Sequence, residues 1–217
     1  MAGEDLSKRL SELGEAMRSH LDRVHEGREA ALQGTRRATQ LSARAIRAGH
    51  RGQLGGAKEL AGEARAALIA ASEALRPFPD VYQSGFVQDA EKEVAEAHIT
   101  IAMVGEERVP GPEDVGVAPA SYLNGLAEAA SELRRAALDA LRASDVDRAG
   151  RSLEHMDEAY GLLITLDYPE AVTHGLRRNT DMLRGVLERT RGDVTLAYRQ
   201  VLLEQMLARV EQSSDSE

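Results

Sequence analysis

The chain has 217 residues, a net charge of -9 and 42% hydrophobic residues, so it is long enough to bury a substantial core. The absence of cysteine excludes disulfides, thiolate metal sites and cysteine nucleophiles. Aromatic residues make up only 3%, which favours helices over the aromatic and β-branched runs typical of strands. Because no window approaches the roughly 18 apolar residues that a membrane span needs, we expect a soluble, cytoplasmic protein with no membrane partner.

The spacing of apolar residues predicts helices throughout the chain, separated by glycine and proline breaks. In chain order they are expected at about residues 6–48, 57–75, 81–104, 120–143, 144–166 and 170–210. A loop rich in proline and glycine separates the third helix from the fourth, and a polar tail is expected from about residue 211.

No long stretch alternates in the manner of a strand, and no linker separates two cores. We therefore predict one all-α domain, a helical bundle spanning residues 1–217. Several helices carry more apolar residues than one buried stripe needs, as in Leu162, Leu163, Ile164 and Leu166. Such helices must be buried on more than one side, which indicates self-association.

Arginine outnumbers lysine by 24 to 3, and it is concentrated in two segments. Its planar group binds phosphate oxygens in pairs, although coding bias in a GC-rich genome would also explain the excess. The first segment, residues 35–51, contains no acidic residue, and we expect it to contact phosphates together with His50. Its arginines are Arg36, Arg37, Arg44, Arg47 and Arg51.

The second segment, DYPEAVTHGLRRNTDMLRGVLERTRGD at residues 167–193, places five arginines beside an apolar stripe at the start of a long helix. A helix this rich in arginine within an acidic protein indicates a partner with phosphates. Arg177 and Arg178 are the candidates nearest its beginning. Because aromatic residues are scarce, binding is expected to depend on phosphates rather than on base stacking.

Three acidic residues of the third predicted helix, Asp89, Glu93 and Glu96, form one line on its surface. Carboxylates at this spacing repel each other, and a divalent cation would reverse that repulsion. Magnesium takes oxygen ligands and keeps several waters, one of which could attack a phosphodiester. The alternative is an ordinary solvated helix face.

Four segments together resemble the translin and Trax family, in that family's order. They are LSARAIRAGHRG at 41–52, YQSGFVQDAEKEVAEA at 82–97, ASYLNGLAEAASELRR at 120–135, and the arginine-rich run at 167–193. The resemblance implies a bundle of about seven helices that assembles into a hollow octamer or a similar closed shell. It also implies binding of single-stranded RNA or DNA, and for Trax-type members a magnesium-dependent carboxylate site that cuts RNA.

Carried onto this chain, the resemblance implies that Glu93, Glu96 and Asp147 are metal ligands and catalytic residues. The fourth carboxylate is expected four residues after Asp147, where this chain has Arg151. The resulting hypothesis is a single-stranded nucleic-acid-binding protein that forms a closed homo-oligomer. Two alternatives stay open: a magnesium-dependent endoribonuclease of the same fold, and a helical scaffold with no nucleic-acid role.

Overall fold

The structure is a computed structural model that describes residues 2–214, and in that range it contains helices and no strand. The all-α prediction is therefore confirmed. In chain order the helices are α1 (Ala2–His50), α2 (Leu54–Leu75), α3 (Pro79–Tyr82), α4 (Phe86–Val104), α5 (Pro112–Val115), α6 (Pro119–Arg142), α7 (Val146–Leu163), α8 (Glu170–Thr173) and α9 (Leu176–Ser214).

The six long helices match the predicted segments, and the three short ones arise at local breaks in the chain. Gly85 has a φ of 99° and is the residue immediately before α4, which it separates from α3. His174 and Gly175 have φ values of 48° and 95°, and they divide the last predicted segment into α8 and α9. Left-handed backbone of this kind interrupts a helix, and glycine adopts it at the lowest cost.

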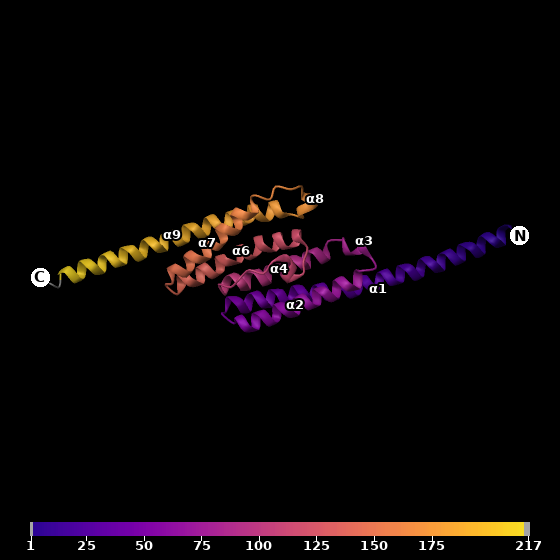
Figure 1. The fold of residues 1–217 in the computed structure, drawn as a ribbon, viewed down its shortest axis with the longest axis horizontal. Coiled ribbons are helices and arrows are strands. Elements are labelled where there is room, and N and C mark those ends of the chain that lie inside the picture. Colours follow the sequence, from indigo (N-terminus) through magenta and orange to yellow (C-terminus); the bar gives the residue numbers. More distant parts are fainter. Residues whose placement is uncertain (1, 215–217) are drawn as a thin grey trace.

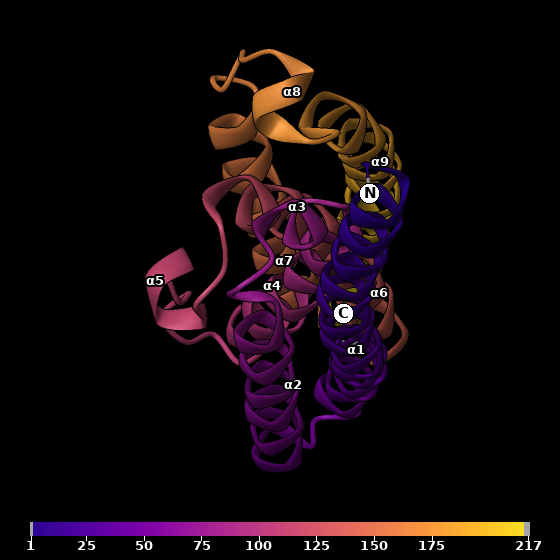
Figure 2. The same cartoon turned by 90° about the vertical axis from the view of Figure 1, so that its right-hand side faces the viewer.

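The long helices lie roughly along one direction and pack in chain order (Figures 1 and 2). Helix α1 packs on α2 and α4, α4 packs on α6, and α6 in turn packs on α7 and α9. Alanines fill many of the contact positions between helices, including Ala31, Ala38, Ala64 and Ala95, so the helices approach closely. Helices α4 and α6 therefore occupy the middle of the bundle, where side chains from both meet.

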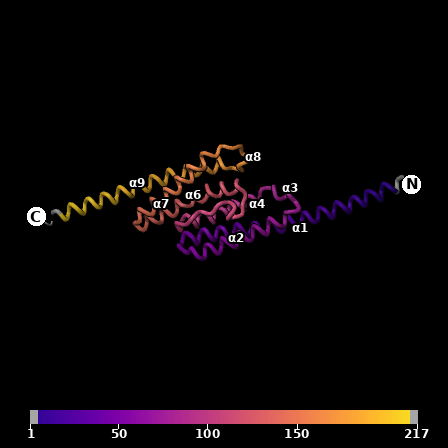
Figure 3. Tube along the Cα trace, in the orientation of Figure 1, coloured from indigo at the N-terminus to yellow at the C-terminus, as the bar shows by residue number. Residues whose placement is uncertain are grey.

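Both long terminal helices extend past the bundle, and they do so at opposite ends (Figures 1 and 3). The free part of α1 exposes an apolar stripe formed by Leu6, Leu10, Leu13, Met17 and Leu21. The projecting part of α9 exposes another, formed by Leu196, Leu202, Leu203, Met206 and Leu207. We call these the α1 stripe and the α9 stripe. Exposed apolar surface of this extent is typical of a contact with another chain.

The C-terminal tail differs from the sequence prediction in one respect, since α9 continues to Ser214 instead of ending near residue 210. Residues 215–217 of the predicted polar tail lie outside the described residues. Within the described part of the chain, none of the helices combines the length and hydrophobicity that crossing a membrane requires.

Candidate carboxylate site

Three glutamates meet between α4 and α6. Glu93 and Glu96 lie one turn apart on α4, and Glu128 reaches them from α6; one carboxylate oxygen of each lies within 4.8 Å of the others. We call this group the carboxylate site. Three oxygens at such distances can contact one small cation at the same time.

Burial and crowding disfavour the ionised form of two of the three glutamates, Glu96 and Glu93. Only 9% of Glu96 is exposed, and burial together with the charge of Glu128 raises its pKa to about 8. Glu93 and Glu132 act on Glu96 in the same direction. Burial also raises the pKa of Glu93, although Lys92 partly offsets this effect. These shifts mean that ionising Glu93 and Glu96 costs free energy that a bound cation would return.

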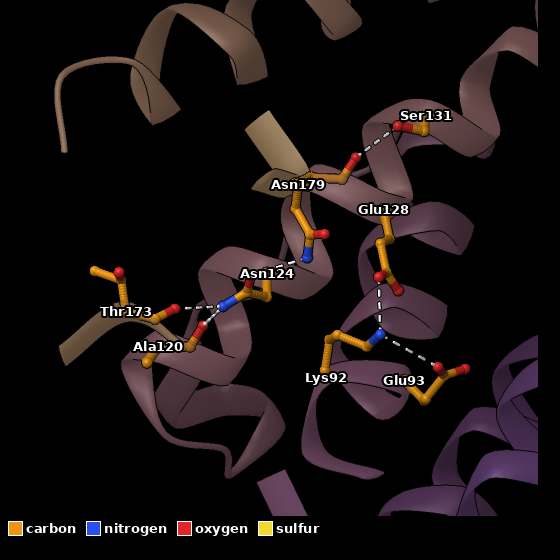
Figure 4. Close-up of polar contacts among 9 residues, drawn as sticks. Lys92, Glu93, Ala120, Asn124, Glu128, Ser131, Thr173 and Asn179 are labelled. Atoms are coloured by element: carbon orange, nitrogen blue, oxygen red, sulfur yellow. Dashed lines mark hydrogen bonds and ion pairs between the residues drawn. The ribbon is translucent and has the colours of Figure 1, made fainter. Parts of the chain in front are cut away.

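Lys92 is the cation nearest to the site (Figure 4). Its Nζ lies 2.8 Å from an oxygen of Glu128 and 3.6 Å from an oxygen of Glu93. The three side chains are all about a quarter exposed, so the site opens to solvent on the side of Lys92.

A second acidic residue of α6, Glu132, lies beside the site and is held by α1. The Nε2 of His50 lies 2.8 Å from Glu132, and the His50 side chain is only 1% exposed. This hydrogen bond lowers the pKa of Glu132 below its ordinary value, so Glu132 stays ionised next to Glu96. The end of α1 is thereby fixed against the acidic face of α6.

The close approach of α4 and α6 depends on Gly125. A Cβ built on Gly125 would lie 2.7 Å from the Cβ of Ala95 and 2.9 Å from the backbone nitrogen of Glu96. Real side chains do not tolerate such contacts, so any larger residue would push the helices apart. Glu128 lies about one turn further along α6, which places it opposite Glu93 and Glu96.

Next to Gly125, Asn124 joins α6 to α8 and α9 (Figure 4). The Asn124 amide donates to the carbonyl oxygen of Thr173 at 2.7 Å and accepts from Asn179 at 2.9 Å. Asn124 therefore joins α6 to α8 and α9, and the next residue, Gly125, packs α6 on α4. Asn179 directly follows Arg177 and Arg178, so this network also positions the start of the second arginine segment.

Asp147 is not part of the carboxylate site, although it was expected to complete it. It lies in the first turn of α7, where it accepts a hydrogen bond of 3.1 Å from the hydroxyl of Tyr198. Its place beside Glu93 and Glu96 is taken by Glu128. Arg151, which stands where the resemblance places the fourth carboxylate, pairs with Glu106 at 2.9 Å.

The arginines expected to bind nucleic acid are all exposed, and none of them forms an ion pair with another described residue. They are Arg36, Arg37, Arg44, Arg47, Arg51, Arg177 and Arg178. The five arginines of α1 lie on one broad face. Arg37, Arg44 and Arg51 are spaced by seven residues, and Arg36 and Arg47 lie eleven residues apart beside them. We call this face the basic stripe. His50 requires a correction: it is buried and engaged with Glu132, which closes its side chain to a phosphate.

Sequence reasoning missed Glu128 and Glu132, although a signal for both was present. They lie four residues apart in the segment LAEAASELRR, so they share a helix face just as Glu93 and Glu96 do. Two acidic pairs on two helices that pack together would have indicated one shared site.

Comparison with known structures agrees with the resemblance read from the sequence. The crystal structure of AfC3PO is 33% identical and superposes with a TM-score of 0.79 over 87% of this chain and 98% of that chain. A complex of AfC3PO with duplex RNA gives 32% identity and a TM-score of 0.78, over 87% of this chain and 97% of that chain. The chain therefore belongs to the translin/Trax family, whose fold the C3PO structures share.

More distant relatives are consistent with this assignment. The structure of apo-NeC3PO superposes with a TM-score of 0.76 at 19% identity, covering 84% of this chain and 96% of that one, which is a likeness of fold. Protein MJ0175 of Methanocaldococcus jannaschii is 29% identical over 138 residues, and the aligned part is 63% of this chain and 61% of that protein. No family model matches the chain.

Proposed function

We propose that this protein binds RNA and cleaves it with the help of a divalent cation held by Glu93, Glu96 and Glu128. The observation that carries the proposal is the convergence of these three carboxylates from two helices to within 4.8 Å. Burial raises the pKa of Glu96 to about 8, which distinguishes this cluster from an ordinary solvated helix face. Gly125 allows the close packing of α4 on α6 that brings the three acids together.

The donor set fits magnesium. All three groups are carboxylates, which suits a hard cation that prefers oxygen, and Glu93 and Glu128 are partly exposed, so solvent reaches the site. When bound, such an ion polarises a phosphodiester and lowers the pKa of a coordinated water. Glu93, Glu96 and Glu128 would fix its position, and Glu132, oriented by His50, would lie beside it to accept a proton or hold a water.

RNA would reach the site along the basic stripe of α1. Arg47 and Arg51 flank His50, and His50 contacts Glu132 at the edge of the carboxylate site. The arginines that would hold phosphates therefore lead toward the acids that would cut them. The relative AfC3PO forms a complex with duplex RNA. We propose that this chain also binds RNA, and the sequence favours single-stranded RNA or DNA as its ligand. We propose the cytoplasm as its location.

We further propose that the protein acts as a closed homo-oligomer, with an octamer as the expected assembly. The α1 stripe and the α9 stripe project from opposite ends of the bundle, and neither is covered by another described part of the chain. A second copy of the chain would bury both. Contacts at two opposite ends can continue from copy to copy until the assembly closes.

Binding without cleavage is the second candidate function. It is favoured by Lys92, because an ammonium already pairs with Glu128 where a metal ion would otherwise lie. In that case the acids would serve only to join α4 to α6. The scaffold alternative has no comparable observation in its favour, since the basic stripe lies exposed rather than paired.

The test is cleavage of a labelled single-stranded RNA and a labelled duplex RNA, with magnesium and with a chelator. The wild type is expected to cut only with magnesium, and Glu128→Gln is expected to lose cleavage while keeping its affinity for RNA. Asp147→Asn is the matched control, since it removes an equivalent charge outside the site and should cut as the wild type does. RNA binding with no cleavage under any condition would leave the second candidate function, and loss of cleavage in Asp147→Asn would contradict the site described here.

A further inference from the structure

We propose that Lys92 is an internal counter-cation that competes with the divalent ion for the carboxylate site. It neutralises part of the site in the metal-free protein and must move away from Glu128 when the ion binds. The inference rests on the proposed metal site and adds a regulatory feature to it, because metal affinity would then be set by a residue that is not itself a ligand.

The geometry places one ammonium on two of the three candidate ligands. The Nζ of Lys92 contacts Glu128 at 2.8 Å across the gap between α4 and α6, and it lies 3.6 Å from Glu93 on its own helix. Figure 4 shows the side chain pointing into the space between these two carboxylates. A metal ion bound to the same oxygens at about 2.0–2.1 Å would face the ammonium at short range. Both cations cannot occupy that space.

The charges around Lys92 hold it in the ammonium form. Burial lowers the pKa of Lys92, but Glu128, Glu93 and Glu96 together outweigh that effect and raise it above the ordinary value. The competitor is therefore a permanent cation at neutral pH. Glu91 directly precedes Lys92 in the chain. It accepts hydrogen bonds from Tyr82 and Ser121, so it offers Lys92 no alternative partner.

Displacement of Lys92 is sterically open. A quarter of the Lys92 side chain is exposed, and its flexible stem lets the ammonium swing toward solvent without a change in the backbone. From there it would lie at the mouth of the site, where phosphate oxygens of an RNA strand would approach. The buried acid Glu96 would in turn lose a neighbouring positive charge and gain the metal ion in its place.

The experiment measures magnesium and manganese binding by titration calorimetry at pH 8, with thermal unfolding as the second readout. Lys92→Met keeps the apolar stem and removes the charge, so it should bind the ion about tenfold more tightly or better and show a larger metal-induced rise in Tm. Lys92→Arg keeps the charge and should bind as weakly as the wild type. Lys58→Met is the matched control, because Lys58 also pairs with a glutamate, at 2.6 Å from Glu107, outside the site.

Three results would overturn the inference. Equal or weaker metal binding by Lys92→Met, with binding abolished by Glu128→Gln, would show a metal site in which Lys92 does not compete. Tighter binding that survives in the double variant Lys92→Met/Glu128→Gln would place the ion elsewhere. Absence of binding in every variant, in protein whose circular dichroism shows a folded bundle, would refute the metal site of the proposed function together with this inference.

Discussion

Gly125 lies so close to α4 that a Cβ on it would stand 2.7 Å from the Cβ of Ala95 and 2.7 Å from the carbonyl oxygen of Lys92. This contact sets the separation of the two helices that carry the candidate ligands. It also explains why a glycine is present in the middle of a 24-residue helix, where glycine costs about 1 kcal/mol relative to alanine.

Replacing Gly125 by alanine is expected to destabilise the protein by about 1–3 kcal/mol, because the added methyl group overpacks a contact between two backbones. It should also weaken metal binding, since Glu128 would move away from Glu93 and Glu96. Chemical denaturation and calorimetry measure the two effects. Gly62→Ala is the control, because nothing lies within 4 Å of a Cβ at that exposed helical position, and it should be neutral or slightly stabilising. Wild-type stability in Gly125→Ala would refute the role given to the close contact.

The basic stripe is expected to bind phosphates. Arg44→Glu/Arg47→Glu should weaken RNA binding and reduce the steepness with which affinity falls as salt concentration rises, because fewer counterions are released. Binding isotherms at several salt concentrations give both quantities. The control Arg76→Glu/Arg142→Glu makes the same change of charge at two exposed arginines outside the stripe. An unchanged affinity and salt slope in the stripe variant would place the RNA elsewhere, with Arg177 and Arg178 the next residues to replace.

Metal affinity should depend on pH through Glu96. Its pKa is raised to about 8, so below that pH a proton competes with the metal ion for the carboxylate. Affinity for magnesium should therefore rise from pH 6 to about pH 8 and then level off. Calorimetry in buffers of different ionisation enthalpy would show a proton released on binding at pH 7. A flat affinity over this range would contradict the burial and crowding described for Glu96.

The carboxylate of Glu96 should make the metal-free protein less stable as pH rises, whereas an acid with a lowered pKa makes a protein more stable. Because the pKa of Glu96 is higher in the folded chain than its ordinary value of 4.5, folding takes up a proton between about pH 4.5 and pH 8. The stability contributed by this group is present at low pH and is lost as pH rises through about 8. Glu96→Gln should flatten that part of the dependence of unfolding free energy on pH, and a slope identical to that of the wild type would count against the assignment.

The apolar stripes are expected to be buried in an oligomer. Leu10→Asp/Met17→Asp introduces two charges into the α1 stripe and should shift the mass measured by light scattering to smaller species. Ser11→Asp/Ser19→Asp adds the same charge on the same helix outside the stripe and should leave the assembly intact. A wild type that is monomeric at micromolar concentration would rule out the closed assembly.

The long helices could be predicted from sequence because each depends on local spacing of apolar residues. The breaks at Gly85 and at His174 could not, since nothing in the apolar pattern marks a left-handed residue within a helical run. At the candidate site, the proximity of Glu93 and Glu96 could be predicted because they lie one turn apart on one helix. Glu128 was missed because its proximity depends on how closely α6 packs on α4, which is decided by Gly125 and Ala95. His50 was misjudged for a related reason: its partner Glu132 lies 82 residues away in the chain.

Anomalous diffraction from crystals grown with manganese tests the central claim most directly, since it locates the ion independently of activity. The account predicts one strong peak between α4 and α6, at about 2.0–2.5 Å from oxygens of Glu93, Glu96 and Glu128, with the ammonium of Lys92 turned away from Glu128. Manganese bound elsewhere, such as beside Asp147, with no peak between these three glutamates, would contradict it.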